Sequence, residues 1–329
     1  MIIDETLAHY SDLAFESAFA VLVLAFVLLI VEYASSKAWA VQDREAAREL
    51  VSAGSSSVAD APSVPGRVAA GPRRRSPAER AGNMGRTVLV VGTVLAVASI
   101  VLRGLGTGRF PLGNMYEFVA MACAASLALG LVWLRKPAYR SLWVFVLVPI
   151  LVLMFLAATV LYADAAPVVP ALQSFWLPIH VTIICIGSGM FLLSGMASIL
   201  YLIRMRHPRG EEGTGPLAHM ALRLPDAQTL DRLAYKSTII AFPLFGAGVI
   251  LGAIWAEAAW GRFWGWDPKE TVSFITWIVY AGYLHARATS GWRDTKAAWI
   301  NIVGFVAMLF NLFIINMVVS GLHSYAGLN

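Results

Sequence analysis

The chain contains eight long apolar stretches, each of about the length that a helix needs to cross a membrane. A spanning helix needs roughly 20 mostly apolar residues, and its backbone groups must hydrogen-bond to one another because the hydrocarbon core offers no water. The stretches are residues 14–33, 87–102, 114–134, 141–162, 176–203, 237–256, 268–288 and 297–320. We therefore predict an all-α polytopic membrane protein with about eight transmembrane helices.

The composition excludes a large soluble domain. Hydrophobic residues make up 58% of the 329 residues and charged residues only 14%, whereas a soluble domain usually carries about 25% charged residues. The net charge of +5 is read as a determinant of orientation, and no nucleic-acid partner is expected. Both cysteines, Cys123 and Cys185, lie inside apolar stretches, which excludes a disulfide framework, a CxxC redox pair and a cysteine zinc site.

The positions of Lys and Arg predict how the spans are oriented. Cytoplasmic loops of membrane proteins carry an excess of these residues. If loop 34–86 is cytoplasmic, the alternation of spans leaves only four of the 25 Lys and Arg residues outside: Arg103, Arg109, Arg262 and Lys269. We therefore expect both termini on the outer side of the plasma membrane.

The chain divides into three segments. Residues 1–33 form the first transmembrane helix with an outer N-terminal tail, and residues 87–329 form a seven-helix core. Between them, residues 34–86 are a basic loop rich in Ser, Ala, Pro and Gly, a composition typical of partial disorder. Its run of three arginines at 73–75 either contacts anionic lipid or serves as a solvated linker that sets topology, and we favour the linker.

Tryptophan is concentrated in residues 255–270, which read WAEAAWGRFWGWDPKE. The tryptophans are Trp255, Trp260, Trp264 and Trp266. An aromatic belt at the membrane interface explains one or two tryptophans at a helix end, but it does not readily explain four in a short loop broken by glycine. We favour a flat aromatic platform that binds a large planar ligand.

The end of this segment predicts the start of the seventh span. Asp267 fits an N-cap, Pro268 the first helical position and Glu270 the partner in a capping box. A capped helix N-terminus also attracts carboxylates. Asn114 and Glu117 repeat the pattern at the start of the third span. The four outer cations lie near these two helix starts, and the sequence does not choose among them as partners for a ligand's acidic groups.

Two histidines are expected at the level of the tryptophan loop. His180 lies one turn into the fifth span and His323 lies just beyond the eighth. Either one alone would more often be a structural histidine. Two at one level beside an aromatic platform favour a pair of ligands for a metal or for haem iron, since imidazole commonly binds iron in proteins.

A third histidine lies within the membrane. His285 follows the start of the seventh span by about 15 residues, which is roughly 20 Å at 1.5 Å per residue. An ionisable residue at that depth suggests function, although a hydrogen bond to a neighbouring helix is the alternative. Membrane b-type cytochromes pair histidines about 13 or 14 residues apart on one helix. The absence of such a pair disfavours an intramembrane electron-transfer protein, and a solute transporter without haem remains a further alternative.

The motif WGRFWGWDPKETVSFITW, followed by HAR, resembles the tryptophan-rich WWD signature of haem-handling proteins in cytochrome c maturation. The DPKET continuation, LQSFWLPIHV, FPLGNMYEF and the terminal SGLHSY resemble the CcsA/ResC branch of System II, which is labelled CcsB in actinobacteria. The resemblance covers about residues 87–329. It is most specific in residues 255–285.

The resemblance implies a role in cytochrome c-type biogenesis. In such a protein, His180 and His323 would ligate the iron of haem b beside the WWD loop. His285 would match an inner haem site whose second ligand comes from a partner membrane protein of the ResB/Ccs1 type. Haem would be conveyed outward and attached to the CxxCH motif of apocytochrome c, with thiol-reducing proteins as further partners. Whether the chain conveys haem only, or also belongs to a holocytochrome c synthase, stays open.

Overall fold

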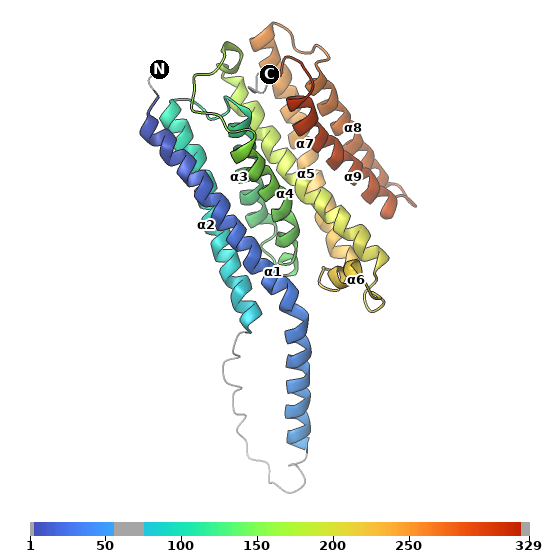
Figure 1. Ribbon diagram of the computed structural model, residues 1–329. Helices are drawn as coiled ribbons and strands as arrows, with labels where there is room; N and C mark the ends of the chain where they lie inside the picture. Colours follow the sequence, from blue (N-terminus) through green and yellow to red (C-terminus); the bar gives the residue numbers. More distant parts are fainter. Residues whose placement is uncertain (1–2, 56–75, 324–329) are drawn as a thin grey trace, which may run out of the picture.

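We describe the protein from a computed structural model that places residues 3–55 and 76–323, with side chains outside 36–55 (Figure 1). Within these ranges every element is helical, as predicted. The elements are α1 (Glu5–Ser55), α2 (Pro77–Thr107), α3 (Met115–Trp133), η1 (Pro137–Tyr139), α4 (Leu142–Thr159), η2 (Pro170–Leu172), α5 (Trp176–Arg206), α6 (Pro216–Ala221), α7 (Ala227–Trp260), α8 (Pro268–Ala288), α9 (Thr295–Phe310) and the π-helical turn η3 (Asn311–Ile315).

Seven of the described helices are long and apolar enough to cross a membrane. The predicted seventh span corresponds to α8, which has the expected bounds Pro268–Ala288. Helix α8 is not among these seven because polar residues such as Ser273 and His285 interrupt its apolar sequence. Nevertheless α8 runs along the bundle beside α7 and α9, and α1 begins at the same end of the bundle at which η3 finishes (Figure 1).

The first two helices extend beyond the predicted spans. Helix α1 continues to Ser55 because the residues after the apolar stretch are rich in Ala, Glu and Arg, which are strong helix formers. Helix α2 begins at Pro77, and its N-cap Ser76 forms a capping box with Glu79. The predicted loop 34–86 is thus partly helical. Its residues 56–75, including the three arginines, lie outside the described residues.

Helix α5 lies at the centre of the bundle, where it packs against α3, α7 and α9 (Figure 1). Close approach depends on glycine. A Cβ on Gly195 would overlap the ring of Phe305 on α9, and one on Gly187 would lie 3.1 Å from the backbone nitrogen of Phe245 on α7. Such small-residue contacts are typical of membrane helix interfaces. They fix α5 closely against both neighbours.

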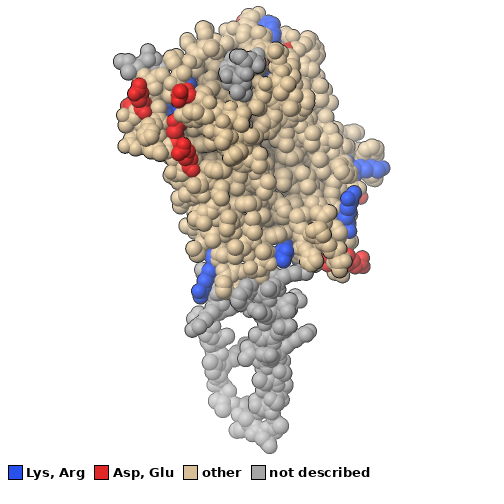
Figure 2. All heavy atoms as spheres, viewed as in Figure 1, with Lys and Arg blue, Asp and Glu red and all other residues tan. Residues whose placement is uncertain are grey.

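The two ends of the bundle differ in their side chains. One end carries the loop from Trp260 to Asp267, and we call it the Trp-rich end. The opposite end, here called the basic end, carries Arg140, Arg206, Arg209 and Arg223. On the face seen in Figure 2, the Lys, Arg, Asp and Glu side chains lie at the upper left, at the top, along the right-hand edge and near the lower end, while the centre of that face is free of them.

Candidate functional site

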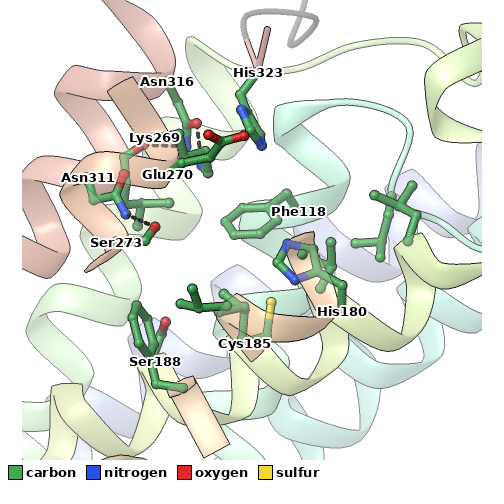
Figure 3. Close-up of a pocket in the computed structure, with 18 of the residues that line it drawn as sticks. Phe118, His180, Cys185, Ser188, Lys269, Glu270, Ser273, Asn311, Asn316 and His323 are labelled. Carbon is green, nitrogen blue, oxygen red and sulfur yellow. Dashed lines mark hydrogen bonds between the residues drawn. The ribbon is translucent and has the colours of Figure 1, made fainter. Parts of the chain in front are cut away.

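A cavity opens inside the Trp-rich end, between α3, α5, α7, α8 and η3 (Figure 3). It holds about 1290 Å³ of empty space, counting the part open to the surroundings. Most of its lining is apolar. Polar groups come from α5, from the start of α8, from η3 and from the C-terminal segment, namely His180, Lys269, Glu270, Asn311, Asn316 and His323. An apolar cavity with a few convergent polar groups is typical of a ligand site.

His180 lies in this cavity because α7 leaves space for its ring. Its Nδ1 lies 2.7 Å from the backbone oxygen of Gly248, and that carbonyl accepts a hydrogen bond. A Cβ on Gly252 would lie 2.7 Å from the ring carbon Cε1, so a glycine is required at this position. Because Nδ1 donates to the carbonyl, the lone pair of a neutral imidazole lies on Nε2, the form that binds metals.

His323 is oriented by a carboxylate. Its Nδ1 donates to Asp267 over 2.7 Å, and the neighbouring Leu322 amide donates to the other oxygen of Asp267 over 2.7 Å. Burial lowers the pKa of His323 below its ordinary value, and the hydrogen bond to Asp267 offsets only part of that shift. The ring is therefore neutral at pH 7. Nδ1 carries its proton, so the lone pair again lies on Nε2.

The structure brings both predicted outer histidines to one tryptophan. The ring of His180 stacks on Trp255 with 6.0 Å between centroids and 11° between planes, and His323 contacts Trp255 edge-on at 5.6 Å. Trp255 is only 1% exposed, and its Nε1 donates to the backbone oxygen of Ala171. It is thus a buried support that both imidazoles share.

The prediction that the four tryptophans form a flat platform is wrong. Trp255 and Trp260 meet at 63°, and Trp264 and Trp266 meet at 88°. Trp255 belongs to α7 rather than to the loop, because α7 continues to Trp260. Only Trp264 of the loop tryptophans lines the cavity, together with Phe263. The rings therefore form a cavity wall and an outer rim instead of a plane.

The loop is held by the first turn of α8. Its capping box forms as predicted between Asp267 and Glu270. The Glu270 carboxylate also accepts from the Gly265 amide over 2.9 Å and pairs with Arg262 at 3.2 Å. Trp266 adopts a φ of 57° and is 69% exposed. A left-handed conformation at a bulky residue costs about 1–3 kcal/mol, so the loop is built to project this ring outward.

Three of the four candidate cations are engaged by carboxylates. Arg103 is 2% exposed and pairs with Glu117 at 3.1 Å and with Asp12 at 3.3 Å. Arg109 contacts both oxygens of Glu117, at 2.8 and 3.0 Å. Glu117 therefore differs from the expected copy of the α8 capping box, because Asn114 caps α3 while the carboxylate binds two arginines. Both arginines are structural, and Arg262 is held by Glu270.

Lys269 is the exception among the four. It lines the cavity, its Nζ donates to Asn316 Oδ1, and it lies 5.6 Å from the centroid of the Phe118 ring. Among the residues whose side chains the structure describes, no carboxylate lies within ion-pair distance of its Nζ. A positive charge that faces a cavity without an acidic partner is suited to an anionic ligand group.

Sequence reasoning missed two asparagines on the same wall. Asn311 and Asn316 line the cavity, and Asn311 is 8% exposed with an Oδ1 that has no partner among the described residues. Its amide nitrogen donates to Ser273 over 2.7 Å (Figure 3). The two asparagines are five residues apart, and the π-helical turn between them places such residues on one face. Polar residues in an apolar span were the available signal.

Comparison with known proteins decides the family. The model of the cytochrome C assembly protein family matches residues 112–323. The cytochrome c biogenesis protein CcsA of Chlamydomonas reinhardtii is 36% identical over 254 residues, covering 74% of this chain and 69% of the relative. CcsA of Gloeobacter violaceus is 33% identical over 294 residues, covering 75% and 87%.

The chain belongs to the CcsA family of cytochrome c biogenesis proteins. The predicted family is therefore confirmed, and so is a role in cytochrome c biogenesis. The solved structure of the cytochrome c haem lyase CcmF matches this chain with a TM-score of 0.62 at 16% identity. The match covers 100% of this chain but only 50% of CcmF, so it shows a shared fold and nothing further.

The third histidine of this CcsA-family protein lies apart from the cavity. His285 is exposed on the surface of α8, towards the basic end. The alternative that it hydrogen-bonds to a neighbouring helix finds no support, because its ring makes no hydrogen bond to any residue whose side chain the structure describes. The structure thus separates the predicted histidines into a pair that shares a cavity and one that faces outward.

The assignment of Arg103 and Arg109 to structure gives a first prediction. Replacing Glu117 by Gln leaves two guanidinium groups without their shared carboxylate in a buried site, which costs about 3–5 kcal/mol. We expect the midpoint of thermal unfolding in detergent, followed by fluorescence-detected gel filtration, to fall by several degrees. Glu257→Gln, at an exposed position of α7, is the control and should unfold like the unaltered protein. Unchanged stability of Glu117→Gln would contradict the structural role.

Proposed function

We propose that this protein binds haem b in the cavity at the Trp-rich end, with His180 and His323 as the two axial ligands of the iron. The observation that carries the proposal is that both imidazoles contact Trp255 and line the same cavity, with Nδ1 bound to a protein oxygen in each. Two such rings have Nε2 as their ligating atom. The membership in the CcsA family supports haem as the ligand.

In this proposal haem is cargo, and the protein contributes position and protection. Two imidazoles close both faces of the iron to oxygen, while the apolar walls of the cavity surround the porphyrin. The CxxCH histidine of an apocytochrome c replaces one imidazole, and its two thiols add to the haem vinyl groups. That chemistry belongs to haem and client, and the protein supplies orientation. Thiol-reducing proteins keep the client cysteines reduced.

In the proposed orientation the Trp-rich end lies on the outer side of the plasma membrane, as expected for a protein of System II. It rests on the concentration of arginines at the basic end, which favours the cytoplasmic side. The cavity then opens towards the compartment in which apocytochrome c receives haem. The tryptophan rings that project from the loop, above all Trp266, would contact the client or the partner protein.

The ligand pair is tested by visible absorption of the detergent-purified protein from haem-replete cells. We expect a bis-imidazole haem spectrum. His180→Ala and His323→Ala should each weaken it, and added imidazole should restore it because the ring is replaced in the space that the mutation leaves. His219→Ala, an exposed histidine on α6, should leave the spectrum unchanged. A colourless protein, with or without its partner, would refute the proposal.

The haem propionates are assigned to Lys269. Arg103, Arg109 and Arg262 each pair with a carboxylate, whereas Lys269 faces the cavity and makes no such pair with any side chain that the structure describes. Asn316 holds its ammonium group, and Asn311 supplies further polar atoms on the same wall. A carboxylate bound there keeps the polar edge of the porphyrin towards α8 and η3, which leaves the vinyl edge on another side of the cavity.

Esterified haem separates this contact from haem binding in general. A hydrogen bond to a charged group contributes about 1.5–3 kcal/mol, so Lys269→Gln should weaken haem binding about 10-fold or more. Haem dimethyl ester, which lacks the negative charges, should bind the variant and the unaltered protein alike in a spectroscopic titration. Lys296→Gln, at an exposed position of α9, is the control. Equal loss of affinity for haem and its ester would reject the propionate contact.

His285 is proposed to bind haem on the outward face of α8, meaning the face turned away from the bundle, together with a ligand from a ResB/Ccs1-type partner. Phe274, Ile278 and Gly282 are exposed on this face at spacings of four residues, and His285 follows one turn later. No side chain approaches Gly282 within 4 Å of a Cβ built there. A planar group can therefore lie flat against the helix beside the imidazole.

Transfer from this inner position would follow the surface of α8 instead of the bundle interior. Tyr280 and Tyr283 are buried on the inward face, where Tyr280 stacks on Phe191 at 3.5 Å. This packed pair of rings favours the outward face of α8 as the path. Phe274 is exposed on the outward face, its ring centroid lies 6.2 Å from that of Trp264, and Trp264 lines the cavity.

The inner position is tested in the complex with the partner. The unaltered complex should hold two haems, and His285→Ala should reduce the content to one while the bis-imidazole spectrum of the outer pair persists. Covalent haem on a co-expressed cytochrome c should fall, as measured by haem staining after electrophoresis. His219→Ala again serves as the control. Full haem content in His285→Ala would reject the inner site without affecting the outer one.

A further inference from the structure

A second pocket lies at the basic end, far along the bundle from the haem cavity. It is formed where the apolar part of α1 ends, where α4 begins and where α6 leads into α7, and it holds about 900 Å³ of empty space, counting the open part. Its charged and aromatic lining residues are Glu32, Tyr33, Arg140, Arg209, Arg223 and Asp226. Three guanidinium groups thus converge on one hollow.

Arg140 and Arg223 are only partly satisfied by the protein. One Nη of Arg140 donates to Asn83 Oδ1 over 2.8 Å, and one Nη of Arg223 donates to the backbone oxygen of Ala34 over 3.0 Å. The Nε of each is buried and has no partner among the described residues. Each guanidinium also carries four Nη hydrogens, and the bonds to Asn83 and Ala34 each use one of them. The two arginines therefore keep donors for a ligand with several acceptor oxygens.

Two carboxylates, Glu32 and Asp226, line this pocket against three arginines, so one positive charge is in excess. Asp226 is occupied as the N-cap of α7, where it accepts from the Thr229 amide over 2.6 Å. Glu32 approaches Arg140 only to 3.8 Å, which is near the limit of an ion pair. The same Asn83 oxygen that holds Arg140 also accepts from Arg86, so a further positive charge lies beside the pocket.

The position of the pocket relative to the apolar part of the bundle indicates which anion it binds. The apolar part of α1 ends at Ser35, and Tyr33 lies beside it with the Arg223 guanidinium 5.5 Å above its ring. Tyrosine and arginine are typical of the boundary between hydrocarbon and headgroups. Basic pockets between membrane helices on the side with excess positive charge bind anionic headgroups.

We propose that this pocket binds a phosphate group, supplied by the headgroup of an anionic phospholipid. Arg140 and Arg223 donate to the phosphate oxygens through their Nη atoms, and Arg209 closes the exposed side. The bound lipid adds to the bonds that already tie α1 to the α6–α7 segment, namely those from the Tyr33 hydroxyl to the backbone oxygen of Met220 and from Arg223 to that of Ala34. The site is independent of the haem cavity.

The test uses the full chain in nanodiscs and compares three probes: phosphatidylglycerol, zwitterionic phosphatidylcholine and inorganic phosphate. Native mass spectrometry counts the lipids retained after release. We expect retained phosphatidylglycerol but not phosphatidylcholine, and at least a 10-fold loss of retention in the double variant Arg140→Gln, Arg223→Gln. Arg206→Gln, an exposed arginine at the same end, is the matched control and should retain lipid normally.

A variant that is expected to bind lipid more strongly separates loss of the site from misfolding. Glu32→Gln removes the carboxylate that competes for Arg140, so it should retain phosphatidylglycerol several-fold more strongly, which a damaged fold would not do. Equal retention in all variants would overturn the site. If inorganic phosphate binds with the same dependence on the two arginines and excludes phosphatidylglycerol, the anion site stands and the lipid as its source is rejected.

Discussion

The Asp267 carboxylate joins the start of α8 to the segment that follows η3. It caps the start of α8, it receives the backbone amide of Leu322 and it receives Nδ1 of His323. The chain beyond η3 is thereby fixed to the first turn of α8, beside the tryptophan loop. The hydrogen bonds from His323 and Leu322 outweigh the effect of burial and lower the pKa of Asp267. The carboxylate is therefore charged at pH 7 and accepts the hydrogen bond from the neutral imidazole.

His180 is held in the same tautomer as His323, with the proton on Nδ1, by a different acceptor. A backbone oxygen on α7 takes the place of a carboxylate, and the small size of Gly252 lets the ring approach the helix. One imidazole is therefore held by a helix pair of the core, and the other by a short segment near the end of the chain. If the two histidines bind haem iron as proposed, a client would displace His323 more readily, because fewer packed elements hold it.

Much of the fold was predictable from the sequence, but the partners of its charges were not. The lengths of the apolar stretches predicted the helices, and the capping residues Asp267 and Glu270 predicted the start of α8. By contrast, Arg103 finds Asp12 on a distant helix, and the ring planes of Trp255 and Trp260 depend on packing. Asn311 and Asn316 would lie on different faces of an ordinary α-helix, and they share one only because of the π-helical turn.

Charges in a membrane protein can be sorted by whether the protein itself satisfies them. A buried charge is costly unless it is paired, so Arg103 and Arg109 around Glu117 belong to the architecture. Among the residues whose side chains the structure describes, no carboxylate lies within ion-pair distance of the Lys269 ammonium, and the buried Nε atoms of Arg140 and Arg223 have no acceptor. The same reasoning thus leads to an anionic ligand at each end of the bundle. The two ligands differ in kind because one group of charges faces an apolar cavity between imidazoles, whereas the other lies at the headgroup boundary beside Tyr33.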